Sequence, residues 1–597
     1  MTSSMRSFLL SNHKVNIMTE KTFIKGKDSD LETSIATMQA KLKSFGFDIE
    51  EASWLNPVSN VYSVHIRDKS CPIMFTNGKG STKKACLASA LGEYFERLSC
   101  NYFFADFYLG EQHSSSDFVH YPNEKWFDSM GDDMPEGLMD ESLWAHFDPT
   151  GELTPAMLVD TNSGVGERGI CAAPYLRLRD GQAVYIPINV IGNIFVSNGM
   201  SAGNTKNEAR VQGLSEVFER YVKNRIIAEG ICLPEVPAEV INRYPLIKQA
   251  IEELESHGYS LKVADASLGG EYPVMSVTLI NPKDGSVFAS FGAHPSFEVA
   301  LERTVTELLQ GRSLDQLDVF HPPTFDQDEV ASPANLEMHF IDSSGYISND
   351  FFRSTPDFEF NDWEHDSKTA DEFAYLSNKI HEMGFDIYIA DYEHLDVYAC
   401  RILVPGMSDI YPVDELVWEN NNEGALFRED FLTLKDGDAE QWQDVFERLE
   451  DGGYNDQTPV APFIGLAPDP NTLWAEIRLG EIKAMLCLAL QDEQAMDWID
   501  WCLALDQASE ATIRHYRCLK ALLEIKQHDE RDYAEYEHGL ALMYGQDNVT
   551  DGIAIVEGEK VFHNLHCPGL SLQGFERHTK LLEGYEKLQQ AKQGNWK

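Results

Sequence analysis

The chain has 597 residues, of which 97 are acidic and 48 basic, so its formal net charge is −49. A surface this acidic excludes general nucleic-acid binding, which depends on Lys and Arg contacts to phosphate, and it favours cationic partners or metal ions. The length and the 43% hydrophobic content predict two to four domains with sizeable cores.

The first residues contain one arginine and a very short apolar patch, which is too little for a signal peptide. We expect residues 1–18 to be a disordered or wrongly assigned extension, with Met18 as the working start. Apolar residues at helical spacing then predict a helix over 31–46. Strands are predicted at 60–66 and 71–76, before a strand end and glycine loop, Phe75-Thr-Asn-Gly-Lys-Gly80, that leads into a helix from Thr82.

The middle of the chain repeats this order of strand, glycine turn and helix, which indicates α/β layering. Residues 110–150 and 322–372 are polar and irregular, and the first of these is predicted to be an insertion. Further elements are predicted as follows: a β-rich stretch at 183–196, a glycine turn at 197–203, a helix from Thr205, a helix at 246–257, strands at 261–265, 273–280 and 287–292, a glycine turn at 291–295, a helix from Ser296, a helix at 370–383, and strands at 386–390 and 398–404.

The character of the chain changes after about residue 420, where helix patterns follow one another with almost no strand pattern. They are predicted at 439–450, 472–489, 491–505, 511–526, 530–544 and 572–592. Their spacing of about 34–40 residues per pair suggests a tetratricopeptide-like array. We therefore predict an α/β domain at 19–415 and an all-α domain at 420–597, whose array is a plausible surface for homodimerisation.

Three segments carry the main repeat. Thr82–Leu98 and Thr205–Tyr221 both begin Thr-Lys and reach Glu-x-Phe-Glu-Arg at the same offset. The third begins at Ser296 and has Glu307 and Gln310 at the equivalent offsets. On a helix, Glu208, Gln212, Glu216 and Glu219 lie in one polar sector with Arg220 beside it, and Arg303, Glu307 and Gln310 share one face.

A single helix with such a face is most often a solvated surface helix. The recurrence of one order after each glycine turn favours a functional face instead. If pseudo-symmetry brings the three helices together, their carboxylates converge and repel one another unless cations compensate them. Glu and Gln oxygens suit magnesium, and arginines suit phosphate. Carboxylates, magnesium and arginine are what a nucleoside triphosphate site requires, and helix starts add N–H donors.

Other candidates are weaker. The segment Asn77–Ser81 lacks the GxxxxGK[ST] pattern, so it is no Walker site. His294 precedes the third helix and could be a base, although a turn histidine is the plainer interpretation. Asp391 and His394 follow a strand and remain weak candidates, and His563 and His566 fit a surface loop better than a metal site. Ten scattered cysteines without CxxC spacing exclude a zinc ribbon or an iron–sulfur nest and are typical of a cytoplasmic protein, and no apolar run could span a membrane.

The segments SALGEYFER at 89–97, GLSEVFER at 213–220 and RTVTELLQ at 303–310, with Val404-Pro-Gly406, closely resemble the ATP-binding elements of the YcaO family. The resemblance covers about residues 19–415, and the helical extension resembles that of its enterobacterial type. It implies a cleft for ATP and magnesium. The implied magnesium ligands are Glu93, Glu96, Glu216, Glu219 and Glu307. The implied ATP-binding residues are Lys27, Ser34, Arg97, Ser201, Asn204, Glu208, Arg220, Arg303 and Gln310.

The best-understood family members phosphorylate a peptide backbone amide oxygen. The azoline-forming members end in a PxPxP tail that enters the active site, whereas this chain ends Gln593-Gly-Asn-Trp-Lys597. The enterobacterial type is associated, as an accessory factor, with β-methylthiolation of an aspartate in small-subunit ribosomal protein twelve. That reaction uses radical chemistry on iron–sulfur clusters, which the cysteine spacing of this chain does not supply, so the chain would assist a radical methylthiotransferase. Its acidic surface would suit a basic ribosomal protein as partner.

Three functions therefore stay open. The chain is an ATP-hydrolysing enzyme or accessory factor that activates or presents a protein substrate, a nucleotide-switched scaffold for protein interactions, or an ATP-dependent ligase of small molecules. The amide-activating chemistry of cyclodehydration or thioamidation on another peptide is a variant of the first.

Overall fold

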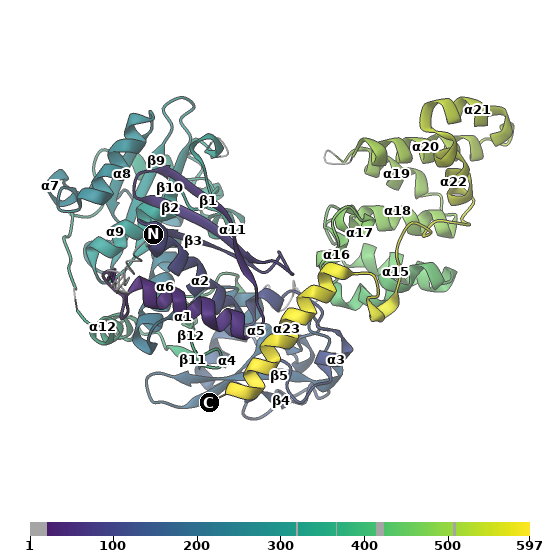
Figure 1. The fold of residues 1–597 in the computed structure, drawn as a ribbon. Coiled ribbons are helices and arrows are strands. Elements are labelled where there is room, and N and C mark those ends of the chain that lie inside the picture. The colour runs from purple at the N-terminus through teal and green to yellow at the C-terminus, as the bar shows by residue number, and fades with distance from the viewer. Residues whose placement is uncertain (1–20, 318–319, 366, 414–422, 506–508, 597) are drawn as a thin grey trace, which may run out of the picture.

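The computed structural model describes residues 21–317, 320–365, 367–413, 423–505 and 509–596. The extension predicted over residues 1–18 and the domain boundary predicted between 415 and 420 lie outside these ranges. An α/β part is followed by a helical part that projects from it (Figure 1). Of the helices in the described ranges, none is both long and apolar enough to cross a bilayer.

Three antiparallel sheets frame the α/β part. Two have three strands each, in the orders β1-β2-β3 and β10-β9-β8, and the third has the order β4-β5-β11-β12-β7 with β6 paired to β5. The strands are β1 Ile49–Val58, β2 Val61–Asp68, β3 Phe75–Gly80, β4 Lys125–Phe127, β5 Ile170–Arg177, β6 Ala183–Pro187, β7 Met200–Gly203, β8 Ser260–Asp265, β9 Val274–Ile280, β10 Val287–Ala293, β11 Tyr388–Tyr392 and β12 Tyr398–Leu403.

Helices cover these sheets and connect their strands. They are α1 Leu31–Ser44, α2 Lys83–Ser99, α3 Gly110–Ser114, α4 Glu141–Phe147, α5 Ile188–Phe195, α6 Lys206–Glu229, α7 Ala238–Ile241, α8 Pro245–Ser256, α9 Phe297–Leu308, α10 Gln327–Val330, α11 Pro333–Ile341 and α12 Thr369–Glu382. The predicted repeats are the units β3–α2, β7–α6 and β10–α9. The side chains of Thr82 and Thr205 cap α2 and α6 by accepting from the backbone N–H three residues on.

The predicted glycine turns are corrected in part: residues 197–199 do form a turn, with Gly199 at a φ of 74°, but Gly78, Gly203 and Gly292 lie within strands. A Cβ at Gly78 of β3 would overlap the carbonyl oxygen of Cys86 in α2. One at Gly203 of β7 would lie 2.8 Å from the backbone nitrogen of Ala209 in α6, and one at Gly292 of β10 would lie 2.8 Å from the carbonyl oxygen of Ala300 in α9. Each glycine therefore lets the following helix pack directly on its strand.

Two other predictions for the α/β part are corrected. Residues 183–196 are not β-rich throughout: β6 ends at Pro187, and α5 buries Val190, Ile191, Ile194 and Phe195 at helical spacing. Packing of this apolar stripe outweighs the strand preference of its β-branched residues. Most of the segment 110–150 is irregular, as predicted, but it is not irregular throughout: its strand β4 joins the six-stranded sheet, and its helix α4 buries Leu143 and Phe147.

The helical part is a stack in which α18 packs on α15 and α19, α19 on α20, and α20 on α21 and α22. Its helices are α14 Arg428–Thr433, α15 Ala439–Asp451, α16 Val460–Phe463, α17 Leu473–Glu476, α18 Leu479–Leu490, α19 Ala495–Leu503, α20 Glu510–Lys526, α21 Tyr533–Tyr544 and α22 Gln546–Val556. The helix predicted at 472–489 is broken before Leu479, where Glu481 accepts from the Arg478 N–H at 2.8 Å. The tetratricopeptide-like character of the stack stays a prediction.

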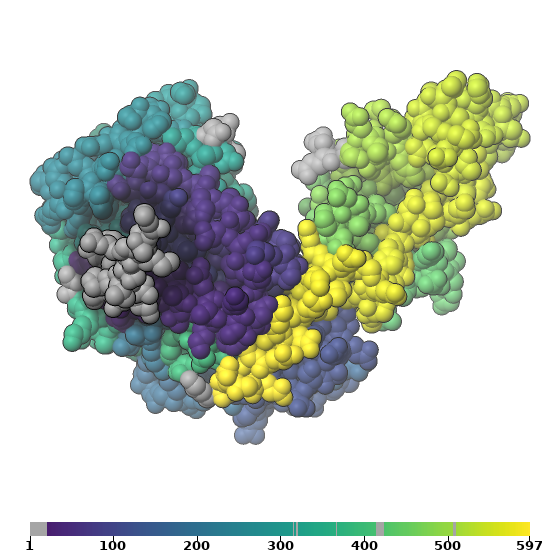
Figure 2. All heavy atoms as spheres, in the orientation of Figure 1, coloured from purple at the N-terminus to yellow at the C-terminus, as the bar shows by residue number. Residues whose placement is uncertain are grey.

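The last helix, α23 Glu576–Asn595, returns to the α/β part and lies along its surface (Figure 2). The ring of Tyr585 lies 4.9 Å from that of Phe104, and its hydroxyl donates to the carbonyl oxygen of Val119. His578 contacts the carbonyl oxygen of Tyr108 at 2.8 Å. The α/β core therefore includes residues from the end of the helical part.

Candidate functional site

A cavity of about 880 Å³ opens between α1, β3, α2, α6 and α9. It draws its lining from segments that are up to about 370 residues apart in the sequence. Every residue that the family resemblance implies for ATP or magnesium lines it except Ser201. These lining residues are Lys27, Ser34, Glu93, Glu96, Arg97, Asn204, Glu208, Glu216, Glu219, Arg220, Arg303, Glu307 and Gln310.

Ser201 lies outside this cavity, contrary to its prediction as an ATP-binding residue. Its side chain is fully buried, and its hydroxyl donates to the carbonyl oxygen of Ala209 at 2.6 Å and lies 3.2 Å from the sulfur of Cys400. Neighbouring side chains of a strand point to opposite faces, so Ala202 lines the cavity while Ser201 packs under α6 and β12.

At the start of α6, the buried Glu208 holds the N-terminal segment over one end of the cavity. Its carboxylate accepts from the backbone N–H of Asp28 at 2.9 Å and lies 3.3 Å from the ammonium of Lys27. The amide of Asn204 donates to the same carboxylate at 3.0 and 3.1 Å and accepts from Ser34 at 2.7 Å. Lys27, Ser34, Asn204 and Glu208, four of the predicted ATP-binding residues, thus form one network.

The twin Glu-x-x-Glu-Arg segments of α2 and α6 make equivalent ion pairs. Arg97 lies 3.3 Å from Glu93, and Arg220 lies 3.0 Å from Glu216, both across one helical turn. The guanidinium of Arg97 also stacks 4.5 Å from the Tyr102 ring, which fixes its orientation. The Nη1 atom of Arg220 is buried and finds no hydrogen-bond partner among the described residues. Arg220 therefore retains a donor for an anion.

Helix α9 contributes the third wall and links the other two. The Nη1 atom of Arg303 donates to Gln212 of α6 at 2.5 Å. Gln310, just beyond the end of α9, donates to the carbonyl oxygen of Asn77 in β3 at 2.5 Å, and Glu307 of α9 forms an ion pair with Lys79 of the same strand. The three helices of the predicted repeat therefore converge on one space.

Burial perturbs the charged groups of this cavity. Burial raises the pKa of Glu96 well above its usual range. The positive charge of Arg97 opposes this shift, and the negative charges of Glu216 and Glu93 add to it. Burial also lowers the pKa of Lys79 to about 8, against the pull of Glu219. Carboxylates outnumber cationic side chains in the lining, so the cavity favours the binding of further positive charge.

The donor chemistry fits a divalent cation with a phosphate ligand: hard carboxylate oxygens lie beside the half-buried guanidinium of Arg220, whose Nη1 atom has no partner among the described residues. Within the described ranges no three His, Cys, Asp or Glu side chains already close on one metal position. Glu93, Glu216 and Glu307 are instead each paired with Arg97, Arg220 or Lys79. A metal ion would have to replace these internal cations.

Sequence reasoning missed several lining residues. Lys79 and Glu302 received no role, and Gln212 was placed on the polar face of its helix without one. Lys79 lies in a strand whose alternate residues are glycine, which was the signal that could have found it. His294 lines the cavity, but burial and then Arg303 lower its pKa to about 3, and its Nδ1 accepts from the Ser296 N–H at 3.0 Å. It is neutral and caps the turn before α9.

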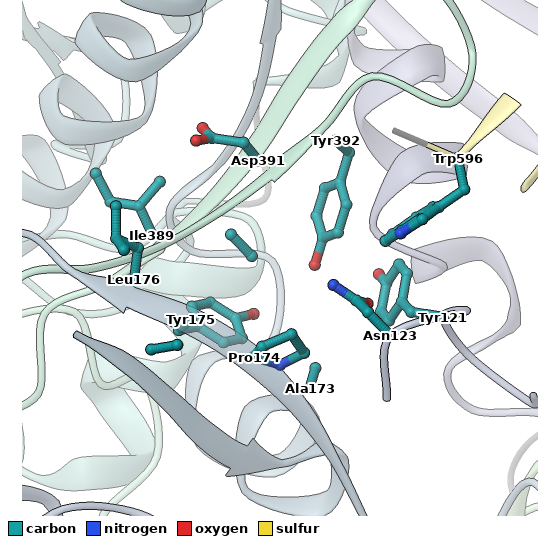
Figure 3. A pocket seen from close by; sticks show the side chains of 12 residues that line it. Tyr121, Asn123, Ala173, Pro174, Tyr175, Leu176, Ile389, Asp391, Tyr392 and Trp596 are labelled. Carbon is teal, nitrogen blue, oxygen red and sulfur yellow. The ribbon is translucent and has the colours of Figure 1, made fainter. Parts of the chain in front are cut away.

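A smaller pocket of about 220 Å³ lies between β5, β11 and the end of the chain, where Tyr121, Tyr392 and Trp596 face one another (Figure 3). Asp391 lines it and pairs with Arg210 at 2.6 Å and Lys206 at 2.9 Å. His394 is buried and stacks 5.3 Å from Trp596. Neither residue lines the larger cavity, and His563 and His566 contact backbone carbonyls in loops.

Two family models match the chain. One, described as "YcaO cyclodehydratase, ATP-ad Mg2+-binding", matches residues 77–408, and the other, "YcaO cyclodehydratase C-terminal domain", matches residues 424–594. These matches cover both parts of the fold.

Curated relatives match over almost the whole chain. An uncharacterized protein of Haemophilus influenzae is 56% identical over 97% of this chain and 100% of its own length. The ribosomal protein S12 methylthiotransferase accessory factor YcaO of Escherichia coli is 56% identical over 96% of this chain and 99% of its own length.

Similar solved structures are more distant. A heterocyclase in complex with substrate and cofactor is 18% identical, with a TM-score of 0.42 over 67% of this chain and 57% of that one. The YcaO protein of Methanopyrus kandleri bound with AMPPCP and Mg²⁺ is 18% identical, with a TM-score of 0.39 over 65% of this chain and 95% of that one. From the two family models and the identity to its relatives, the chain belongs to the YcaO family of ATP- and Mg²⁺-binding proteins.

Proposed function

We propose that this chain binds and hydrolyses ATP with Mg²⁺ in the large cavity and acts as an accessory factor in β-methylthiolation of an aspartate in ribosomal protein S12. The observation that carries the proposal is the convergence of α2, α6 and α9 on one cavity that buries carboxylates beside arginines. The name of the Escherichia coli relative supports the protein-level role.

Each wall of the cavity has a task in this proposal. The carboxylates of Glu93, Glu96, Glu216, Glu219 and Glu307 would hold Mg²⁺. Arg97, Arg220 and Arg303 would hold phosphate oxygens, and Lys27 and Ser34 would lie on the nucleoside side, with Asn204, Glu208 and Gln310 in support. When bound, ATP supplies a transferable phosphoryl group, and the arginines neutralise the charge that develops on it.

The accessory role requires partners. The chain carries a net charge of −49, which complements a basic ribosomal protein and favours its association. We propose that the helical stack is tetratricopeptide-like and docks this protein or a radical methylthiotransferase. Trp596, near the end of α23, lies at the smaller pocket and not among the residues of the ATP cavity.

ATP hydrolysis by Glu216→Gln tests the proposal, measured as phosphate release with Mg²⁺, with and without ribosomal protein S12 and a methylthiotransferase. We expect a loss of about 100-fold or more, because one carboxylate of the charge-stabilising set is removed. The matched control is Glu229→Gln on the same helix, whose carboxylate is 54% exposed and pairs with Arg225; it should keep the wild-type rate.

Binding of ATP without turnover under every condition would instead favour a nucleotide-switched scaffold. A wild-type protein that neither binds nor hydrolyses ATP would contradict the proposal. Removal of the whole helical part is a poor test, because α23 packs in the α/β core.

A further inference from the structure

Strand β3 has alternating residues with two different tasks. Gly78 and Gly80 face α2, and a Cβ on either would come within 2.7 Å of the α2 backbone or closer. Lys79, between them, points to the opposite face. The alternation of glycine and polar residues at 77–80 therefore belongs to a strand that lies between two helices.

The polar side of this segment contacts α9 and Gln310, which lies just beyond the end of α9. Gln310 donates to the carbonyl oxygen of Asn77 at 2.5 Å, Glu307 pairs with Lys79, and the Ser81 hydroxyl donates to Glu302 at 3.0 Å. Three successive contacts fix the register between β3 and α9. The position of the Lys79 side chain in the cavity follows from this register.

Lys79 lies among the carboxylates that the proposed function assigns to Mg²⁺. Its side chain keeps 23% exposure where it lines the cavity, and it pairs directly with Glu307. The other charged groups that act on it are Glu219, Glu93 and Glu216, which favour its positive charge, and Arg303, which opposes it. Among the described residues, the other lysines that line the cavity pair with different carboxylates. Lys27 pairs with Glu208, and Lys25 lies near Glu298 and Glu364.

We propose that Lys79 is an internal counter-ion of the metal site, which holds Glu307 while Mg²⁺ is absent and binds a phosphate oxygen of the nucleotide when Mg²⁺ takes that carboxylate. The proposal rests on the proposed function. Glu307 cannot give the same oxygen to an ammonium and to a divalent cation without strong repulsion between the two cations. The flexible four-carbon stem of lysine allows its ammonium to move to another anion within the cavity, and a nucleotide phosphate would supply one.

Two titrations by calorimetry test the inference with Lys79→Met, whose side chain has a similar length but no charge. The affinity for Mg²⁺ alone, without nucleotide, should rise about 3- to 10-fold, because the competing cation is gone. The affinity for ATP at saturating Mg²⁺ should fall about 10-fold, because a charge-assisted contact to phosphate is lost. A residue that only supports the fold would weaken both affinities together.

Lys84→Met is the matched control, because Lys84 lies near the start of α2 with 55% exposure, pairs with Glu32 and does not line the cavity. It should leave both affinities unchanged. If Lys79→Met fails to fold, as judged by circular dichroism, Lys79→Arg replaces it; the retained charge should preserve ATP affinity within about threefold.

Wild-type affinity for Mg–ATP in folded Lys79→Met, or a tenfold loss in Lys79→Arg, would overturn the role of Lys79. A wild-type protein that does not bind ATP would overturn the proposed function instead, so the two failures are distinguishable.

Discussion

The large cavity and the helical stack are built from similar amphipathic helices, but they place different side chains in contact. The stack buries an apolar cluster that includes Ile482, Leu486 and Leu519, each 2% exposed or less. The cavity face of α6 instead places Glu208, Glu216 and Arg220 against charged residues of other segments. The stack therefore gains stability from apolar burial, whereas the cavity holds charged groups that are only partly exposed, such as Glu216 at 19% and Arg220 at 24%, and gains less from its own contacts.

The few buried charges of the stack sharpen the contrast. Lys483 in α18 is 5% exposed and lies 2.7 Å from Glu450 and 2.8 Å from Asp456, so its charge is compensated within the fold. In the cavity, Arg220 pairs with Glu216 but leaves a buried N–H without a partner among the described residues. A buried charge that the fold leaves partly uncompensated is typical of a binding site.

The largest expected effect is a loss of stability from a substitution in the core of the stack, which should leave the cavity unaffected. Ile482→Ala should lower the free energy of unfolding by about 2–5 kcal/mol, because it leaves a cavity in the fully buried core of the stack. Urea denaturation measures this loss. The affinity for Mg–ATP should stay at the wild-type value below the unfolding transition.

Ile482→Val is its control, with an expected loss of about 0.5–1.5 kcal/mol. A fall in ATP affinity in parallel with stability would show that the stack and the cavity are coupled, and would break the comparison.

A smaller effect is expected at Lys592 of α23, the helix that joins the two regions. Lys592 is fully buried, donates to Asn101 and to the carbonyl oxygen of His120, and burial lowers its pKa to about 7. Between pH 7 and the ordinary lysine pKa of 10.5, the unfolded chain holds a proton that the folded chain releases. Rising pH therefore stabilises the folded protein through this group in that window, and below pH 7 it has no such effect.

Urea denaturation from pH 6 to 9 measures this, and Lys592→Met should lack the gain. The wild-type free energy of unfolding should rise relative to the variant by about 1 kcal/mol per pH unit above pH 7. Lys580→Met, at an exposed pair with Glu583 on the same helix, should follow the wild-type slope. Parallel curves for wild type and Lys592→Met would mean that the hydrogen-bond acceptors and the Tyr121 ring keep Lys592 charged.

The repeat of strand and long helix could be predicted from the sequence, because α2 and α6 share a Thr cap, an apolar stripe and a Glu-x-x-Glu-Arg ending. The glycines of β3, β7 and β10 were read as turns, since local sequence does not distinguish a turn glycine from one required by a helix packed on its strand. For the same reason α5 was predicted as strand. Its β-branched residues favour a strand locally, and only packing in the folded protein makes this segment a helix.

For the site, too, local sequence patterns were sufficient for some residues, whereas others depend on tertiary packing. Residues on the repeated helix faces were placed in one cavity, because helical periodicity fixes which side chains share a face. Ser201 was included because the family resemblance implied it, but strand alternation turns its side chain away from the cavity. Lys79 was left without a role, because its partner Glu307 lies more than 200 residues away and only tertiary packing brings them together.

The central claim, that the carboxylates of three helices hold one Mg–ATP site, is tested most directly by calorimetric titration of ATP with and without Mg²⁺. The account predicts that wild-type protein binds ATP in a Mg²⁺-dependent manner. It also predicts that the triple variant Glu93→Gln, Glu216→Gln and Glu307→Gln, which removes one carboxylate from each of α2, α6 and α9, loses the Mg²⁺ dependence and at least about 100-fold in affinity. Mg²⁺-dependent binding that survives in a folded triple variant would contradict it.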